Sequence, residues 1–254
     1  MSISKYGKTA VVALCMAVLA LPAAAVAQDD EEEYTGPNFL LVRTVNTKTS
    51  GTEDWVELQK ELVAARPDDA EGSRDVWEVV RGRMGTFHIV SYEDDRAGYD
   101  GQGDGGEPPL GDATATWVEA ISDTIASRAQ TESRIHRDMS IPLDEDAEMS
   151  MLVLRRLTLK TGQTGAFHDW VREELKPALE AGGADGVYFS HRTHGGSVNI
   201  CTIAGHIANW AELDGPGSFD HMSEGEIDGL FANWDDMVED HQVDILQHHA
   251  ELSY

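Results

Sequence analysis

Leu40-Leu41-Val42-Arg43 returns 112 residues later as Leu152-Val153-Leu154-Arg155. The same spacing places Lys48-Thr49 on Lys160-Thr161. Both apolar blocks are short and lie among β-branched residues, which predicts a buried strand in each place. A repeat of a whole stretch at a fixed spacing indicates a duplicated structural unit.

Later blocks of the chain align in the same order with slightly different spacings, as loop insertions in a duplicated unit would produce. The aligned pairs are Trp55 with Trp170, Trp77 with Tyr188, Arg81 with Arg192, Ile89 with Ile200, His136 with His249 and Ser140 with Ser253. We therefore predict two repeats, at 38–141 and 149–254.

Each repeat is predicted to contain the elements β-α-β-β-α-β. In the first repeat these are strands at 39–47, 76–83 and 87–92, a helix at 53–65, a second helix carrying Trp117, Ile121 and Ile125, and a closing strand around 134–141. In the second they are strands at 151–159, 187–194 and 198–203, a helix at 166–181, a second helix carrying Ile227, Leu230, Phe231 and Trp234, and a closing strand around 246–254. Ser223 and Glu226 have the spacing of a capping box.

This order of elements is ferredoxin-like, so the expected fold class is α+β, with two tandem ferredoxin-like units that pair sheet to sheet. In that order, and in its helix tryptophans, the chain from Asn38 to Tyr254 resembles the dimeric α+β barrel superfamily, which includes antibiotic-biosynthesis monooxygenase and NIPSNAP-like domains. The resemblance implies an intramolecular dimeric α+β barrel made by tandem duplication. It is a resemblance of fold, and a fold does not determine function.

The first 27 residues have the parts of a secretory signal peptide. Two lysines precede an uncharged apolar run, and the stretch ends in Ala25-Val26-Ala27. The run is too short to span a bilayer, which needs about 20 apolar residues. We expect cleavage after Ala27, a disordered acidic tip at 28–37, and a periplasmic or secreted protein.

The formal net charge of −27 limits the partners of this protein. So acidic a surface repels phosphate backbones and anionic lipids, which argues against nucleic-acid partners and, after leader cleavage, against membrane partners. We expect a small-molecule ligand. Because two repeats can cover each other, both a monomer and a homodimer are compatible with the sequence.

Arginines are the first candidate ligand-binding residues. Arg43 and Arg155 take matched positions on the first strands, and Arg81 and Arg192 take matched positions on the second strands. A buried guanidinium needs a carboxylate or a bound anion. These residues therefore bind either an anionic or oxygen-rich small molecule or acids of the chain itself, such as Glu78.

Aromatic and histidine side chains are the second group of candidates. Trp77 and Tyr188, with His136, are predicted to line a ligand cavity, and His191 and His249 are candidate acid–base residues because imidazole titrates near neutral pH. No metal site is predicted, because His191 and His194 are three residues apart on one strand and point to opposite faces.

Sequence motifs do not decide whether the protein is an enzyme. Hydrolase, phosphate-loop, dinucleotide-binding and Cys-x-x-Cys motifs are absent from the sequence. Two functions remain, an exported small-molecule-binding protein and a cofactor-independent monooxygenase-like enzyme. A third, haem binding, is implied by a resemblance to chlorite dismutase-like proteins and would need a proximal histidine, for which His241 and His168 are the candidates. Otherwise no cofactor is expected.

Overall fold

The computed structural model describes residues 36–67, 73–96, 110–144, 147–214 and 217–254 of the chain. The predicted leader, and the predicted acidic tip up to residue 35, lie outside the described residues. None of the described helices is both long and apolar enough to cross a membrane.

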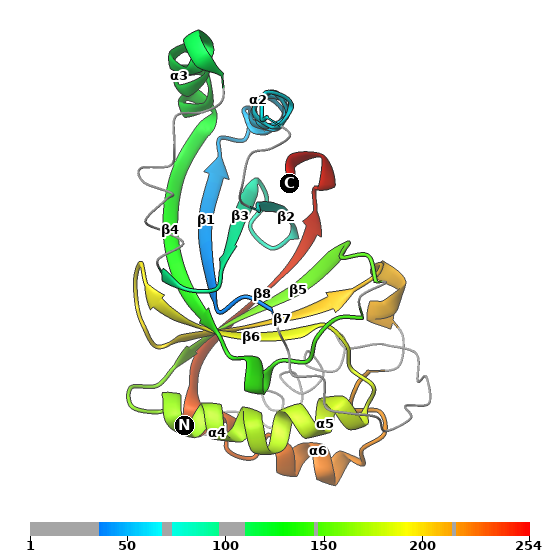
Figure 1. Ribbon diagram of the computed structural model, residues 1–254. Coiled ribbons are helices and arrows are strands. Elements are labelled where there is room, and N and C mark those ends of the chain that lie inside the picture. The colour runs from blue at the N-terminus through cyan, green and yellow to red at the C-terminus, as the bar shows by residue number, and fades with distance from the viewer. Residues whose placement is uncertain (1–35, 68–72, 97–109, 145–146, 215–216) are drawn as a thin grey trace. The chain divides into compact units, whose positions relative to one another are not determined.

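The elements follow each other along the chain in the expected order, β-α-β-β-α-β in each predicted repeat (Figure 1). The first six are β1 (Phe39–Thr47), α2 (Thr52–Ala64), β2 (Asp75–Arg81), β3 (Thr86–Glu93), α3 (Thr114–Thr124) and β4 (Ile125–Ile135). The next are β5 (Met151–Leu159), α4 (Thr164–Trp170), a π-helical turn (Val171–Leu175), α5 (Lys176–Ala181), β6 (Val187–His194), β7 (Ile200–Ile207), α6 (Glu224–Leu230), α7 (Trp234–Met237) and β8 (Val238–His248). Short 3₁₀ turns lie at Gly111–Ala113, Arg137–Met139, Trp210–Asp214 and Ala250–Leu252.

The predicted assembly of these elements is wrong. The strands do not form two ferredoxin-like sheets that pair face to face as a dimeric α+β barrel; they form one closed antiparallel barrel in the order β1-β3-β2-β8-β5-β7-β6-β4. For example, β2 bonds along its edge to β8, with Trp77 opposite His248. An unpaired strand edge leaves a row of N–H and C=O groups without partners, and closure into a barrel removes every such edge.

The closing strands begin earlier than predicted. β4 starts at Ile125 and β8 at Val238, each directly after a helix. The spacing of Ile121 and Ile125 suggested that the helix continues to Ile125. It ends at Thr124, whose hydroxyl donates a hydrogen bond to the carbonyl oxygen of Ile121, and such a local bond competes with helix continuation. The capping box at Ser223 and Glu226 is confirmed.

The described chain divides into two compact units, which we call the His136 unit and the His249 unit. The His136 unit comprises 136–191 and 199–243, and the His249 unit comprises 36–135, 192–198 and 244–254. The His136 unit holds β5, β7 and most of β6 of the second predicted repeat, together with the segment 136–141, which follows β4 of the first. The His249 unit holds β1, β2 and β3 of the first predicted repeat, together with the segment 249–254, which follows β8 of the second. This exchange of segments 136–141 and 249–254 brings together residues that are distant in sequence.

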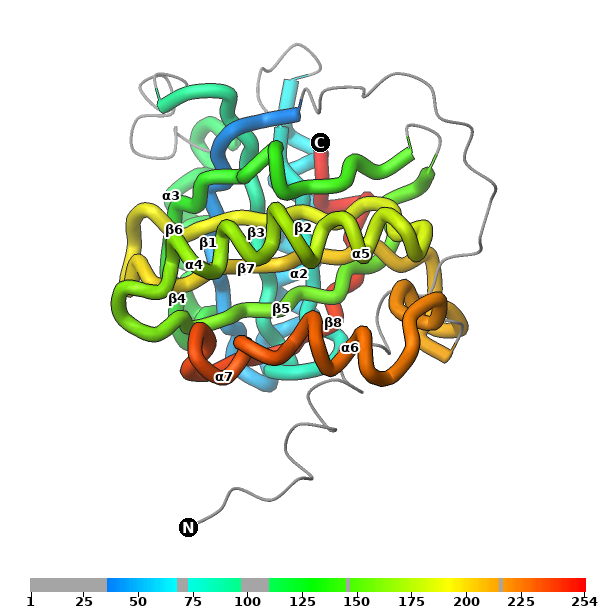
Figure 2. Tube along the Cα trace, turned by 90° about the horizontal axis from the view of Figure 1, so that it is seen from below, coloured from blue at the N-terminus to red at the C-terminus, as the bar shows by residue number. Residues whose placement is uncertain are grey.

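Each unit has its own apolar core. In the His136 unit, Phe167 and Trp170 of the helix pack with Leu157 and Phe189 of the strands, where α4 and α5 cover β5, β6 and β7 (Figure 2). The core of the His249 unit consists of Val45, Trp55, Val76, Phe87, Ile121 and Leu252.

The two closing segments are held by equivalent hydrogen bonds. His136 N donates to Phe189 O, and the Ser140 hydroxyl accepts from Phe189 N at 3.0 Å. His249 N donates in the same way to Val76 O, and the Ser253 hydroxyl accepts from Val76 N at 2.9 Å.

These bonds pair Phe189 with Val76 and so correct the sequence alignment of β2 and β6. Trp77 corresponds to Ser190 rather than Tyr188, and Arg81 corresponds to His194 rather than Arg192. The alignment by residue type slipped by two positions in this part of the chain, because a shift of two preserves the alternation of faces in a strand.

Candidate functional site

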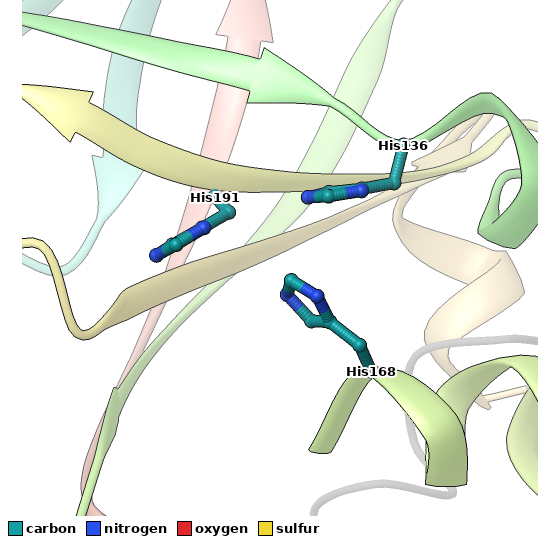
Figure 3. Close-up of side chains that lie close together, drawn as sticks. All are labelled: His136, His168 and His191. Atoms are coloured by element: carbon teal, nitrogen blue, oxygen red, sulfur yellow. The ribbon is translucent and has the colours of Figure 1, made fainter. Parts of the chain in front are cut away.

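Three histidines of the His136 unit converge between a strand and a helix. His136 directly follows β4, His168 lies in α4 and His191 lies in β6 (Figure 3). One ring nitrogen from each lies within 4.8 Å of the other two. The ring centroids are 4.5 Å apart for His136 and His168, 5.4 Å for His168 and His191, and 6.3 Å for His136 and His191.

The local structure explains why these rings meet. Side chains alternate along a strand, so His191 lies on the same face of β6 as Phe189, which packs in the core beneath α4. His168 follows the buried Phe167 on that helix. His136 is brought to the same place by its backbone bond to Phe189.

Cys201 lies next to this group. It is the partner of His191 in the β6–β7 register, and its Sγ is 3.7 Å from Nε2 of His168. The side chain is buried, with 3% of its surface exposed, and burial raises the pKa of the thiol to about 12. Because the site lies in a largely apolar layer, charge there is costly unless a partner compensates it.

The surroundings of His168 favour its neutral form. Burial lowers its pKa, and the nearby His191 and Arg172 lower it further. Arg172 itself bonds to Asp138 at 2.7 Å. Burial alone would raise the pKa of Asp138, but this hydrogen bond lowers it below its usual range. A neutral imidazole has one nitrogen with a free lone pair, which is the form that binds metal ions.

The helix that carries His168 is irregular immediately after it. A five-residue π-helical turn at Val171–Leu175 separates α4 from α5. Such turns are rare and occur frequently at functional sites. This irregularity marks the same end of the helix as the histidine group.

The group has the donor chemistry of a transition-metal site. Imidazole nitrogens suit Zn²⁺, copper, iron and Ni²⁺. Zn–N bonds of about 2.0–2.1 Å place tetrahedral ligand nitrogens about 3.3 Å apart, so the three rings must approach each other further to hold such an ion. The three rings are half-buried.

The same arrangement does not suit haem. His241, one of the two candidate ligands, lies in β8 rather than on a helix. His168, the other candidate, has the rings of His136 and His191 beside it, where a porphyrin plane would have to lie.

The other predicted histidine, His249, lies in the His249 unit between two carboxylates. Its Nε2 is 2.9 Å from Glu78 and its Nδ1 is 3.1 Å from Glu251. Both ring nitrogens therefore have a carboxylate partner within the chain.

The predicted aromatic residues lie on the opposite face of the strands from the apolar cores. Trp77 is 2% exposed and packs against His248 with ring centroids 4.8 Å apart. Tyr188 accepts a hydrogen bond from Leu143 N at 3.2 Å, and burial raises the pKa of its hydroxyl. Their role in a ligand cavity stays a prediction.

The four predicted arginines come from four strands and both units. Arg43 donates to the amide oxygen of Gln130 at 3.3 Å, Arg81 is exposed, Arg155 is buried, and Arg192 lies beside Gly196 in the β6–β7 hairpin. Their anion-binding role also stays a prediction.

Sequence reasoning named His136, His168 and His191 separately but did not bring them together, and it did not consider Cys201 as a site residue. The available signal was the alternation in β6, which places His191 on the helix-facing side with Phe189. The exchange of the closing segment, which adds His136, leaves no mark in the sequence.

Comparisons with known proteins show the fold but no family. No family model matches the chain, and no curated protein matches it. Among solved structures, a "putative monooxygenase" from Fusobacterium nucleatum subsp. nucleatum matches with 12% identity over 84% of this chain and 93% of that one, at a TM-score of 0.56.

Two further structures extend this result. An anthrone oxidase-like protein matches with 10% identity over 85% of this chain and 92% of that one, at a TM-score of 0.55. A "putative chlorite dismutase" also matches, with 10% identity over 84% of this chain and 96% of that one, at a lower TM-score of 0.47. At these identities the likeness is one of fold alone.

Proposed function

We propose that this protein binds a transition-metal ion through His136, His168 and His191. The observation that carries the proposal is the convergence of one ring nitrogen from each residue within 4.8 Å. Three imidazoles from three separate elements supply directional lone pairs, and imidazole is a ligand type that suits transition-metal ions. The ion would also join the closing segment, the helix and the strand, and so stabilise the folded state.

Zinc binding by the purified full-length protein tests the proposal. The protein is first stripped with a chelator, and binding is then followed by calorimetry and native mass spectrometry. We expect one ion per chain and a loss of affinity of more than about 100-fold in His191→Ala, because removal of even an outer partner of a metal ligand costs 10–100-fold.

His194→Ala is the matched control. His194 is three residues further along the same strand, is exposed, and bonds to Glu132 rather than to the histidine group. The zinc affinity of the His194→Ala protein should equal that of the unsubstituted protein. Equal zinc binding by His191→Ala and the unsubstituted protein would contradict the proposal.

A second candidate function is a monooxygenase-like enzyme that acts on an electron-rich small molecule. It is supported by the likeness of fold to monooxygenase-like and anthrone oxidase-like proteins. Oxygen uptake with phenols and anthrones, measured on metal-free and zinc-loaded protein, tests this candidate. Turnover in the metal-free protein that survives His191→Ala would separate the enzyme from the metal site.

A further inference from the structure

We infer that Cys201 is the fourth ligand of the ion, so that the site is a closed site of three imidazoles and one thiolate. Such a donor set selects a soft or borderline ion, Zn²⁺ or Cu⁺, over Mg²⁺ and Ca²⁺, which prefer oxygen ligands. The inference rests on the proposed function, because it requires an ion at the three histidines.

The strand register places the thiol beside the histidine group. His191 and Cys201 are direct partners on β6 and β7. Directly opposed residues of antiparallel strands point to the same face, with Cβ atoms about 5 Å apart. The thiol and the imidazole of His191 therefore approach the space under α4 from neighbouring positions of one sheet.

The contact with His168 has the right length for two ligands of one ion. Sγ of Cys201 is 3.7 Å from Nε2 of His168. In a tetrahedral zinc site, bonds of about 2.0–2.1 Å to nitrogen and 2.3 Å to sulfur place these two ligand atoms about 3.5 Å apart. This pair already stands at nearly that separation. The thiol is not part of the group of nitrogens that lie within 4.8 Å of one another, so the four side chains would close in on the ion when it binds.

The burial of the four side chains fits a closed site with the thiol as its floor. Cys201 belongs to the apolar core of the His136 unit, together with Leu157 and Phe189. The three histidines are half-buried. The thiol is thus the most deeply buried of the four candidate ligands.

The His249 unit has neither the histidine group nor the thiol. Glu78 takes the position of His191, and its partner on β3 is Phe87. Phe87 therefore stands where the other unit has Cys201, and it stacks on Trp55 with ring centroids 4.2 Å apart. The sulfur is present only in the unit that has three converging imidazoles.

Cobalt(II) titration of the full chain, followed by absorption, tests the inference. Co²⁺ replaces Zn²⁺ in tetrahedral sites, and a thiolate ligand adds a sulfur-to-cobalt charge-transfer band in the near ultraviolet. We expect this band in the unsubstituted protein. Cys201→Ser should lose the band and bind Co²⁺ at least about tenfold more weakly.

Cys15→Ser is the matched control, because the sequence has two cysteines and Cys15 lies in the predicted leader. The band should survive this substitution. Cobalt binding without the band in the unsubstituted protein, or a band that survives Cys201→Ser, overturns the inference and leaves the proposed function standing. An unsubstituted protein that binds neither Co²⁺ nor Zn²⁺ overturns both. The first measurement needs no variant, so a folding defect in Cys201→Ser does not remove the test.

Discussion

The two closing segments have the same backbone bonds but different side-chain surroundings. His136 and His249 each donate a backbone N–H to a strand, at Phe189 and Val76 respectively. Around His136 lie two more imidazoles, and a thiol contacts one of these, that of His168. Around His249 lie two carboxylates.

The helix positions differ in the same sense. Counted from the residue before each helix, Gly51 and Gln163, the place of His168 is taken by Val56 in the His249 unit. One backbone arrangement thus supports a group of three imidazoles in one unit and an imidazole between two carboxylates in the other. Function on this fold depends on a few side chains and not on the backbone.

The largest expected effect comes from exchanging those side chains. His168→Val should weaken zinc binding more than about 100-fold, because it removes one of the three imidazole ligands. His249→Val should leave zinc affinity unchanged. Both are measured by calorimetry on chelator-stripped protein.

The reverse exchange sharpens the comparison. Val56→His combined with Glu78→His should create a second ion site around His249, which native mass spectrometry would detect as two zinc ions per chain. If this variant still binds one zinc ion per chain, equivalent backbone positions in the two units do not place their side chains in equivalent geometry.

The sequence predicted the order of the elements and most helix and strand positions, because hydrophobic periodicity depends on local spacing. It did not predict barrel closure. That property depends on edge pairing such as that of β2 with β8, and the residues at strand edges are not distinguished by composition.

For the candidate site, the sequence named the three histidines but did not predict that they meet. His136 and His191 are 55 positions apart, and hydrogen bonds between the segments 136–141 and 187–189 bring them together. The slip of two positions in the alignment also hid the correspondence of His191 with Glu78. Pairing between distant strands is a tertiary property, which spacing along the chain does not encode.

The second prediction concerns the shared serines. Ser140→Ala leaves the buried N–H of Phe189 without its partner, so we expect a loss of about 1–3 kcal/mol in the free energy of unfolding. Ser253→Ala should cost somewhat less, because Ser140 is 1% exposed whereas Ser253 is half-buried. Urea unfolding measures both.

Ser122→Ala is the control, because its exposed hydroxyl bonds only within its own helix, to Val118 O. It should change stability by less than about 0.5 kcal/mol. A cost for Ser140→Ala no larger than this would show that the closing segments are not held by the serine bonds.

The third prediction concerns the pH dependence of stability, through Glu132 of the His249 unit. Burial alone would raise the pKa of this carboxyl, but hydrogen bonds from Arg96, Thr193 and His194 lower it to about 2. A carboxyl whose pKa is lower in the folded state than in the unfolded state stabilises the fold. This stabilisation is complete at pH values above the unfolded-state pKa near 4.5, and it is lost as the pH falls through the folded-state pKa of about 2.

We expect Glu132→Gln to cost about 1–2 kcal/mol at pH 7 and almost nothing near pH 2. The value is below the full linkage energy because Arg96 is half-exposed and solvent screens the pair. Urea midpoints of both proteins between pH 2 and 7 measure the difference. Parallel pH profiles would contradict the role given to Glu132.

The smallest expected effect on stability concerns two equivalent lysines, one in each unit. Lys48 donates to Asp123 O at the end of α3, and Lys160 donates to Asp235 O in the short helix α7. A cation near carbonyl groups at the end of a helix stabilises it by about 0.3–1 kcal/mol, and salt weakens the effect. Lys48→Met and Lys160→Met should therefore lower the free energy of unfolding by similar amounts, and less at 1 M salt than at low salt. Unequal costs would show that the two lysine contacts are not equivalent, and would confine the equivalence of the units to the closing segments.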